Sequence, residues 1–176
     1  IPEEGVIVQS DAAFIQGIFG IGGESRGDLF LLSSDRNQEI SAEQLNESHT
    51  GKILIGGSFL SLEAYKKALA LKVSGIIVGG FNYFDLKHIL GYTLGVAITG
   101  TEDLDTSLIV TEGYGKIKMS TRTFDLLKKH NGKFVSINGA TQIRAGVIRP
   151  EIVIPLKDEE LSVEKKSSSD QLGIQE

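Results

Sequence analysis

Two neighbouring segments share one pattern, in which a continuous apolar run, a Gly-Gly pair and an amphipathic stretch follow one another. They span residues 51–73 and 74–91. Apolar runs without polar alternation are typical of strands buried on both faces of a parallel sheet. Together with later apolar runs, the pattern predicts a parallel β-α-β-α-β layer within residues 51–132. The pairs Gly56-Gly57 and Gly79-Gly80 are expected in turns between strand and helix.

Polar residues at three positions predict where the helices of this layer begin. Ser61, Asn82 and Ser120 each precede an amphipathic stretch and can accept a hydrogen bond from a first-turn N–H group. A shorter helix is expected after Ser41, because Gln44 follows at the spacing of a capping box. Helices are therefore expected at four places.

The segments on either side of this layer are rich in β-strand patterns. The first contains the stretch GIFGIGGESRG at residues 17–27, where no lysine and no helix pattern follow the glycines. A phosphate cradle needs the N–H groups of a helix start, so we expect a strand connection here. Because Arg26 lies in this stretch, an alternative remains open, in which the loop binds an anion or a partner's carboxylate.

After Gly132 the pattern returns to alternating strands. Asn138-Gly139 predicts a type I′ hairpin turn, because both residues tolerate positive φ. Pro150 and Pro155 place the last strand at the edge of a sheet, where a missing N–H is tolerated.

The expected fold class is α/β with α+β flanks. A central parallel β-α-β-α-β layer carries N- and C-terminal β segments that form a small barrel or extend the sheet. The expected parts are an N-terminal β segment with a short helix (1–50), the α/β core (51–132), a C-terminal β segment (133–156) and a polar tail (157–176). The tail is Ser-rich and charged, so we expect it to be disordered and dispensable.

The amino-acid composition argues against nucleic-acid binding and against a membrane-spanning segment. Hydrophobic residues make up 40% of the 176 residues, cysteine is absent and the net charge is −5. There is no basic surplus for nucleic-acid binding and no apolar run of membrane-spanning length. The lack of cysteine excludes disulfides and fits a reducing cytoplasm. The chain starts at Ile1 within a strand pattern and without a signal peptide pattern, so we expect a fragment of a longer cytoplasmic protein.

Several stretches together resemble the C-terminal part of an uncharacterised bacterial protein family. They are AAFIQGIFGIGGESRG, GIIVGG, LGVAITGTED, LIVTEGYG and SINGATQIRAGVIRPEIVIPL. The resemblance covers most of residues 2–156 and implies barrel-sandwich segments upstream, but no activity. Separately, residues 51–111 are similar in plan to DRTGG-type βαβαβ regulatory modules, which is a likeness of fold alone.

The candidate site lies at the carboxyl ends of the expected parallel strands, where open α/β sheets bind their ligands. Glycines there let a ligand approach the backbone, and the acids could hold Mg²⁺ or ligand hydroxyl groups. No cofactor is otherwise expected. The candidate ligand-binding residues are Gly57, Ser58, Gly80, Thr99, Gly100, Glu102, Thr111, Glu112 and Gly113.

Two functions remain open for this site. The first is a non-catalytic regulatory or assembly module, with other domains of the parent chain or further copies of it as partners. The alternative is an enzyme with Glu112 as its acid/base group, assisted by Mg²⁺. His49, His88 and His130 show no metal-ligand spacing, and no catalytic constellation is evident. A closed pocket over Gly80 and Glu112 would favour the enzyme, and an exposed apolar patch would favour assembly.

Overall fold

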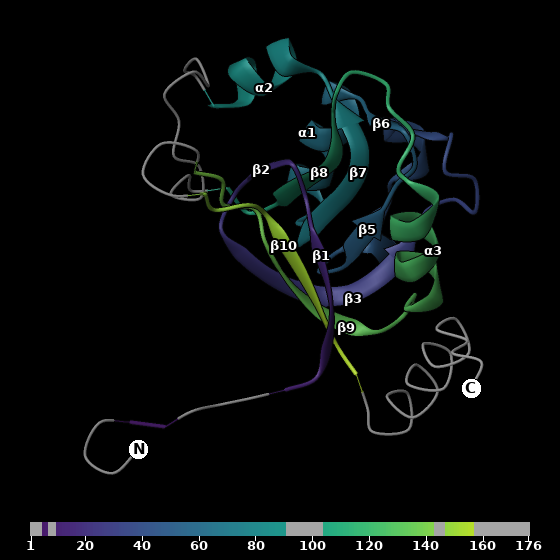
Figure 1. Cartoon of the computed structure of the whole chain (residues 1–176). Coiled ribbons are helices and arrows are strands. Elements are labelled where there is room, and N and C mark those ends of the chain that lie inside the picture. The colour runs from purple at the N-terminus through teal and green to yellow at the C-terminus, as the bar shows by residue number, and fades with distance from the viewer. Residues whose placement is uncertain (1–4, 7–9, 91–103, 143–146, 157–176) are drawn as a thin grey trace, which may run out of the picture.

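The computed structural model describes residues 5–6, 10–90, 104–142 and 147–156. Within these residues it is a mixed α/β structure, with three α-helices, two short 3₁₀ helices and ten strands. Figure 1 shows their arrangement. The strands are β1 (Ala12–Gln16), β2 (Phe19–Ile21), β3 (Glu24–Leu31), β4 (Glu39–Ile40), β5 (Ile53–Ile55), β6 (Phe59–Leu60), β7 (Gly75–Phe81), β8 (Ser107–Tyr114), β9 (Phe134–Asn138) and β10 (Glu151–Pro155). The α-helices are α1 (Leu62–Ala70), α2 (Tyr83–Leu90) and α3 (Thr121–Lys129), and the 3₁₀ helices are Ala42–Gln44 and Glu47–His49.

The expected helix starts are confirmed. Ser61 accepts a hydrogen bond from the Ala64 N–H, and Ser120 accepts one from the Thr123 N–H. The Asn82 side chain accepts from the Phe84 N–H at 2.8 Å. The short helix after Ser41 is a single 3₁₀ turn.

The strands predicted from the buried apolar runs pair in parallel, and the short strands β4 and β6 continue the parallel pairing beyond β7. The C-terminal part of β3 pairs with β5, β5 pairs with β7, and β7 pairs with β8. The expected turn at Gly79-Gly80 is wrong, because both glycines lie within β7 at an irregularity of its pairing with β8. The strand expected at 94–100 lies outside the described residues.

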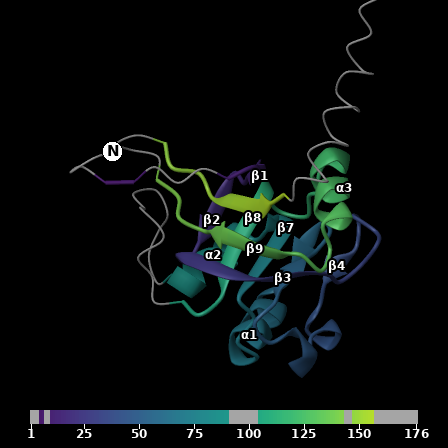
Figure 2. The same ribbon diagram turned by 90° about the horizontal axis from the view of Figure 1, so that it is seen from below.

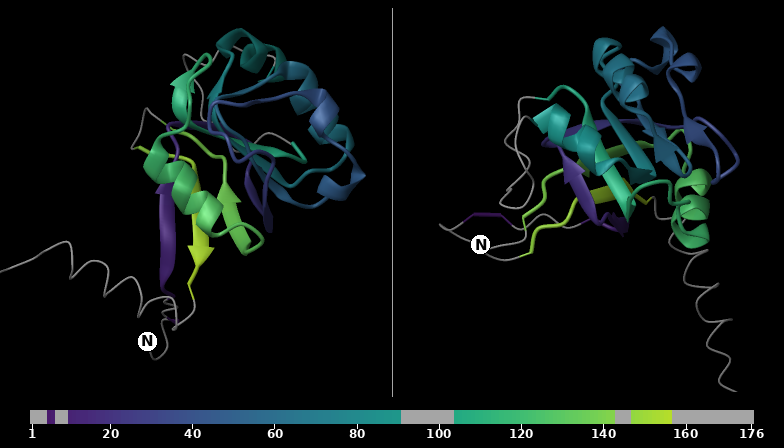
Figure 3. Two further views of the ribbon diagram at one scale, coloured as in Figure 1. Left: turned by 90° about the vertical axis from the view of Figure 1, so that its right-hand side faces the viewer. Right: turned by 90° about the horizontal axis from the view of Figure 1, so that it is seen from above.

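The N- and C-terminal β segments pair with each other and extend the sheet. The order β1-β10-β9-β3 is antiparallel throughout, and β3 then continues into the parallel strands through β5. Among the described strands, the sheet is mostly open, with β1 at one end (Figure 3, left), and β2 pairs with β8 beside β7. The described strands do not show a closed barrel.

The expected hairpin at Asn138-Gly139 is wrong. β9 ends at Asn138, β10 begins only at Glu151, and the Gly139 N–H donates to the Gly23 carbonyl instead of closing a turn. The edge position expected for the last strand is wrong as well, because β10 lies between β1 and β9. Pro155 is tolerated there because the β9–β10 pairing stops at Val153, so no ladder hydrogen bond requires its N–H.

Apolar side chains fill both faces of the parallel strands. On one face, Leu54, Ile76 and Leu108 pack with Tyr65 of α1 and Leu86 of α2. On the other face, the inner sides of β1, β10, β9 and β3 pack over the parallel strands together with α3. Figure 2 shows the parallel strands between α1 on one side and β9 and β10 on the other. Within the described residues, no helix is long and apolar enough to span a membrane.

The stability of this fold should fall when His49 becomes protonated. The imidazole is buried against Phe30, with ring centroids 4.9 Å apart, and its Nδ1 accepts the Asn46 N–H at 3.2 Å. Burial, and then the nearby charge of Lys52, lower the pKa of His49 from its usual 6.5. The folded state therefore holds the neutral form, so its contribution is present above pH 6.5 and is lost as the pH falls below that value.

We expect the melting temperature to fall between pH 7.5 and 5.5, and His49→Gln to reduce this fall. Glutamine keeps an acceptor for the Asn46 N–H but does not titrate. His88→Gln, at an exposed position of α2, is the matched control and should keep the wild-type dependence. An unchanged pH dependence in His49→Gln would contradict this role of His49.

Candidate functional site

The structure brings six of the expected site residues together at the carboxyl ends of the parallel strands. Gly57 and Ser58 follow β5, Gly80 lies in β7, and residues 111–113 lie in β8. The Gly79 N–H donates to the Gly57 carbonyl at 2.9 Å, and Gly80 pairs with Gly113. The other three, Thr99, Gly100 and Glu102, lie outside the described residues.

The chain's own backbone occupies the space over the glycines of β7. The segment that follows β8 crosses them, and its Ile117 N–H donates to the Ser58 carbonyl at 3.2 Å. A Cβ atom added at Gly80 would overlap the Gly115 carbonyl oxygen, and one added at Gly79 would overlap the Ile117 carbonyl oxygen. The absence of side chains here therefore permits two segments of backbone to meet.

A second segment covers the turn after β5. Ser58 is buried, its hydroxyl donates to the Asn37 carbonyl at 2.6 Å, and its N–H donates to the Gln38 carbonyl at 3.0 Å. The Arg36 guanidinium then donates from Nη1 to the Met119 carbonyl at 3.0 Å. These contacts join the loop before β4 to the segment that leads into α3.

Glu112, the candidate acid/base group, holds the start of α3. Its Oε1 accepts the Ser120 N–H at 2.8 Å, and the Thr111 hydroxyl lies 3.4 Å from the same oxygen. The Thr111 hydroxyl also donates to the Val78 carbonyl at 3.3 Å. A carboxylate beside a helix N-terminus is stabilised by the N–H dipoles there. Both side chains thus have partners within the fold.

Glu112→Ala should therefore destabilise the protein. The substitution leaves the Ser120 N–H without its acceptor, at a cost of about 1–2 kcal/mol. Glu112→Gln retains an acceptor oxygen and should cost less than about 1 kcal/mol, chiefly the charge effect at the helix start. Urea unfolding measures both values. Glu24→Ala, on an exposed strand position, is the control and should change stability by less than about 0.5 kcal/mol. A stability of Glu112→Ala equal to that of the control would contradict this structural role.

The described residues offer no evident ligand set for Mg²⁺. No group of three or more His, Asp or Glu side chains is placed to hold a metal ion in this part of the chain. Of the two acids among the candidate residues, Glu102 lies outside it. Glu112 faces the first turn of α3.

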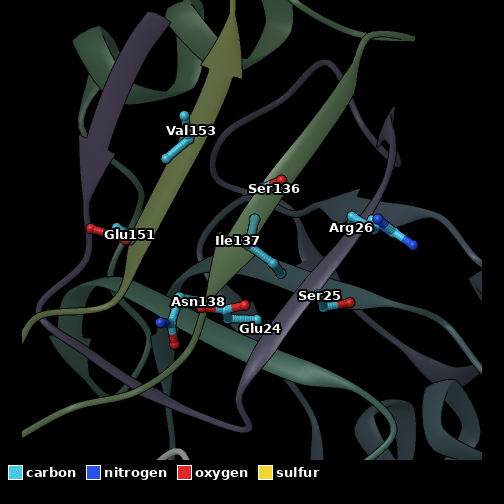
Figure 4. Close-up of a pocket in the computed structure, with 8 residues that line it drawn as sticks. All are labelled: Glu24, Ser25, Arg26, Ser136, Ile137, Asn138, Glu151 and Val153. Atoms are coloured by element: carbon cyan, nitrogen blue, oxygen red, sulfur yellow. The ribbon is translucent and has the colours of Figure 1, made fainter. Parts of the chain in front are cut away.

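The structure contains a polar groove that the sequence reasoning missed. It has a volume of about 450 Å³ and lies on the face of β3, β9 and β10 that points away from the core (Figure 4). Its lining residues are Glu24, Ser25, Arg26, Ser136, Ile137, Asn138, Glu151 and Val153. Arg26, considered from the sequence as an anion-binding loop residue, lies in β3. The alternation of apolar and polar residues from Val135 to Asn138 in β9 was the available signal.

The side of β1, β10, β9 and β3 that points away from the core is called the outer face. Two aromatic side chains lie on it beyond the groove. The strand register places Phe14, Val153, Ser136 and Arg26 in one row across β1, β10, β9 and β3. Phe134 pairs with Asp28 farther along β9 and is 59% exposed, and Phe14 is 53% exposed. The outer face therefore combines apolar side chains with charged neighbours of both signs.

A second aromatic group lies near the strand ends. Tyr114, at the end of β8, contacts Tyr83 of α2 and Phe19 of β2, with ring centroids 5.3 and 5.9 Å apart. Burial, and then the neighbouring Tyr83, raise the pKa of Tyr114 above its usual value. Phe84, in contact with Tyr83, is 70% exposed.

Comparisons of the chain with models of protein families, with curated proteins and with solved structures found no match.

Proposed function

We propose that this chain is a non-catalytic assembly module that binds another polypeptide through the outer face of β1, β10, β9 and β3. Other domains of a parent protein are the expected partners. The observation that carries the proposal is the exposure of Phe14 and Phe134 on this face, beside the partly exposed Val153. Exposed aromatic residues grouped on one face are characteristic of protein interaction sites.

The composition of the face supports a protein partner. Its apolar side chains lie beside Arg26, Glu24 and Glu151, so the face offers both apolar contacts and charged groups to a partner. Arginine and phenylalanine are enriched at such surfaces. Among the described residues, no helix or second sheet covers this side of β9 and β10 (Figure 2).

The contacts of the strand-end residues argue against the enzyme. The Gly115–Met119 backbone lies over Gly79 and Gly80, and Glu112 is engaged with Ser120. A catalytic acid/base group must reach a reacting proton in the substrate. Regulation by a small ligand at this edge would require that backbone segment to move.

Chemical cross-linking in cells that produce the protein tests the proposed face. The wild type should form a discrete covalent adduct, which Phe134→Glu and Val153→Glu should each abolish. Phe84→Glu is the matched control, because it introduces the same charge at an exposed aromatic residue of α2 and should leave the adduct unchanged. Melting curves establish that each variant is folded. The absence of an adduct in the wild type, or its persistence in both outer-face variants, would overturn the proposal.

A further inference from the structure

β1 lies at the end of the sheet with one edge unpaired among the described residues. The Leu156 N–H donates to the Asp11 carbonyl, and the Gly17 N–H donates to the Pro150 carbonyl. Backbone groups alternate in direction along an antiparallel strand, so residues 11, 13, 15 and 17 face β10. The N–H and C=O groups of Ala12, Phe14 and Gln16 therefore point away from the sheet.

The sequence of β1 does not protect this edge. Edge strands are commonly blocked by a charged residue, a proline or a bulge, and Ala12–Gln16 contains no charged residue and no proline. Its pairing with β10 is continuous over all five residues, without a bulge. An unprotected edge of this kind is a template for a further strand.

Helix α3 borders the same edge. A groove of about 480 Å³ lies between them, lined by Ala13 and Phe14 of β1 and by Arg122, Asp125, Leu126 and Lys129 of α3. The four helix residues recur at positions i, i+3, i+4 and i+7, so they form one stripe along α3. The small side chain of Ala13 leaves the space between the strand and this stripe open.

The charge of the stripe indicates the chemistry of a partner. Arg122, in the first turn of α3, is exposed and carries a positive charge that an acidic side chain of a partner can contact. A strand paired with β1 would point alternate side chains toward α3, and acidic residues suit those positions. The intervening side chains would lie beside the exposed Phe14 and are best apolar.

We propose that β1 and α3 bind an extended segment of a partner polypeptide, in which acidic and apolar residues alternate, as an additional strand beside β1. This proposal rests on the proposed function as an assembly module and names the chemistry of the partner. The backbone pairing supplies affinity, and the α3 stripe selects for acidic side chains.

The probe is a synthetic peptide, acetyl-Glu-Val-Glu-Val-Glu-Val-Glu-amide, titrated against the full chain by calorimetry. We expect saturable binding that weakens as the salt concentration rises, because the charge contacts are exposed. A peptide with Lys in place of Glu, and one with methylated backbone nitrogens at alternate residues, should bind at least about tenfold more weakly. Amide exchange at Ala12, Phe14 and Gln16 should slow in the complex.

Two substitutions test the site from the protein side. Phe14→Pro removes an outward N–H, and Arg122→Glu reverses a charge of the stripe. Each should weaken binding of the acidic peptide at least about tenfold. Lys87→Glu, at an exposed position of α2, is the control and should bind as the wild type does. If Phe14→Pro fails to fold, the methylated peptide still tests the backbone pairing, and Arg122→Glu still tests the charge contact.

Three outcomes would overturn the proposal: no binding of the acidic peptide, equal binding of the methylated peptide, or equal binding of the Lys peptide. Concentration-dependent dimerisation that Phe14→Pro abolishes would assign the edge to a second copy instead. These outcomes do not bear on the proposed binding through the outer face, because that proposal is tested by substitutions of Phe134 and Val153. A failure of strand addition and a failure of the assembly function are thus distinguishable.

Discussion

Gly80→Val should destabilise the protein by at least about 3 kcal/mol, because two segments of backbone meet at this glycine. The added Cβ would overlap the Gly115 carbonyl oxygen, and the Ile117 amide nitrogen lies 3.1 Å from the same position. Backbone cannot rotate away as a flexible side chain can, so the crossing segment must shift as a whole. Urea unfolding of the purified variant measures the loss.

Gly132→Ala is the contrast for this experiment. Gly132 has a φ of +83°, and a Cβ atom added there would meet open space, so the cost of the substitution is backbone strain alone. We expect roughly 1–2 kcal/mol there. If Gly80→Val were as stable as the wild type, residues 115–119 would not lie over β7 as described.

Gly139→Asn should be nearly as damaging as Gly139→Ala, with losses of about 2–3 kcal/mol in both variants. A Cβ atom at this position would overlap the Ile21 carbonyl oxygen, whichever residue carries it. In a type I′ turn, by contrast, asparagine is well tolerated. The pair of variants therefore separates close packing from turn geometry.

The comparison needs a control on the same strand. Ser136→Asn introduces the same side chain at an exposed position of β9 and should change stability by less than about 0.5 kcal/mol. Thermal and urea unfolding of the four proteins provide the values. A stable Gly139→Asn beside an unstable Gly139→Ala would favour the turn that the sequence predicts.

The helix starts and the parallel strands could be predicted because their signals are local. Ser61 and Ser120 bind N–H groups three residues away, and strands such as Ile53–Ile55 are apolar because both faces are covered. Both signals depend little on distant parts of the chain. The helix and strand positions of the core follow from them.

Glycines were harder to interpret, because a glycine indicates close approach without indicating what approaches. At Gly80 the sequence is compatible with a nearby ligand, a turn or a crossing backbone segment. The structure shows a crossing segment, because the Gly115 carbonyl, 35 positions away in the sequence, lies over Gly80. In the same way, the group that approaches Gly139 is the carbonyl of Ile21, which is distant in the sequence. Local turn signals therefore failed where the neighbour is remote in sequence.

The outer face was missed for a different reason. Alternation in β9 places Phe134, Ser136 and Asn138 on one side, and a solvated face and a binding face give the same alternation. Only the strand register shows that Phe14 and Val153 lie in one row with Ser136 and Arg26. The groove thus depends on pairings between both ends of the chain.

Amide hydrogen exchange at the strand-end edge tests most directly whether that edge is closed to ligands. The relevant groups are the Gly79 N–H, bonded to the Gly57 carbonyl, and the Ile117 N–H, bonded to the Ser58 carbonyl. We expect both amides to exchange slowly in the free protein, with rates unchanged by Mg²⁺, magnesium nucleotides or sugar phosphates. Fast exchange in the free protein that slows on addition of one of these compounds would contradict the closed edge and restore the ligand site.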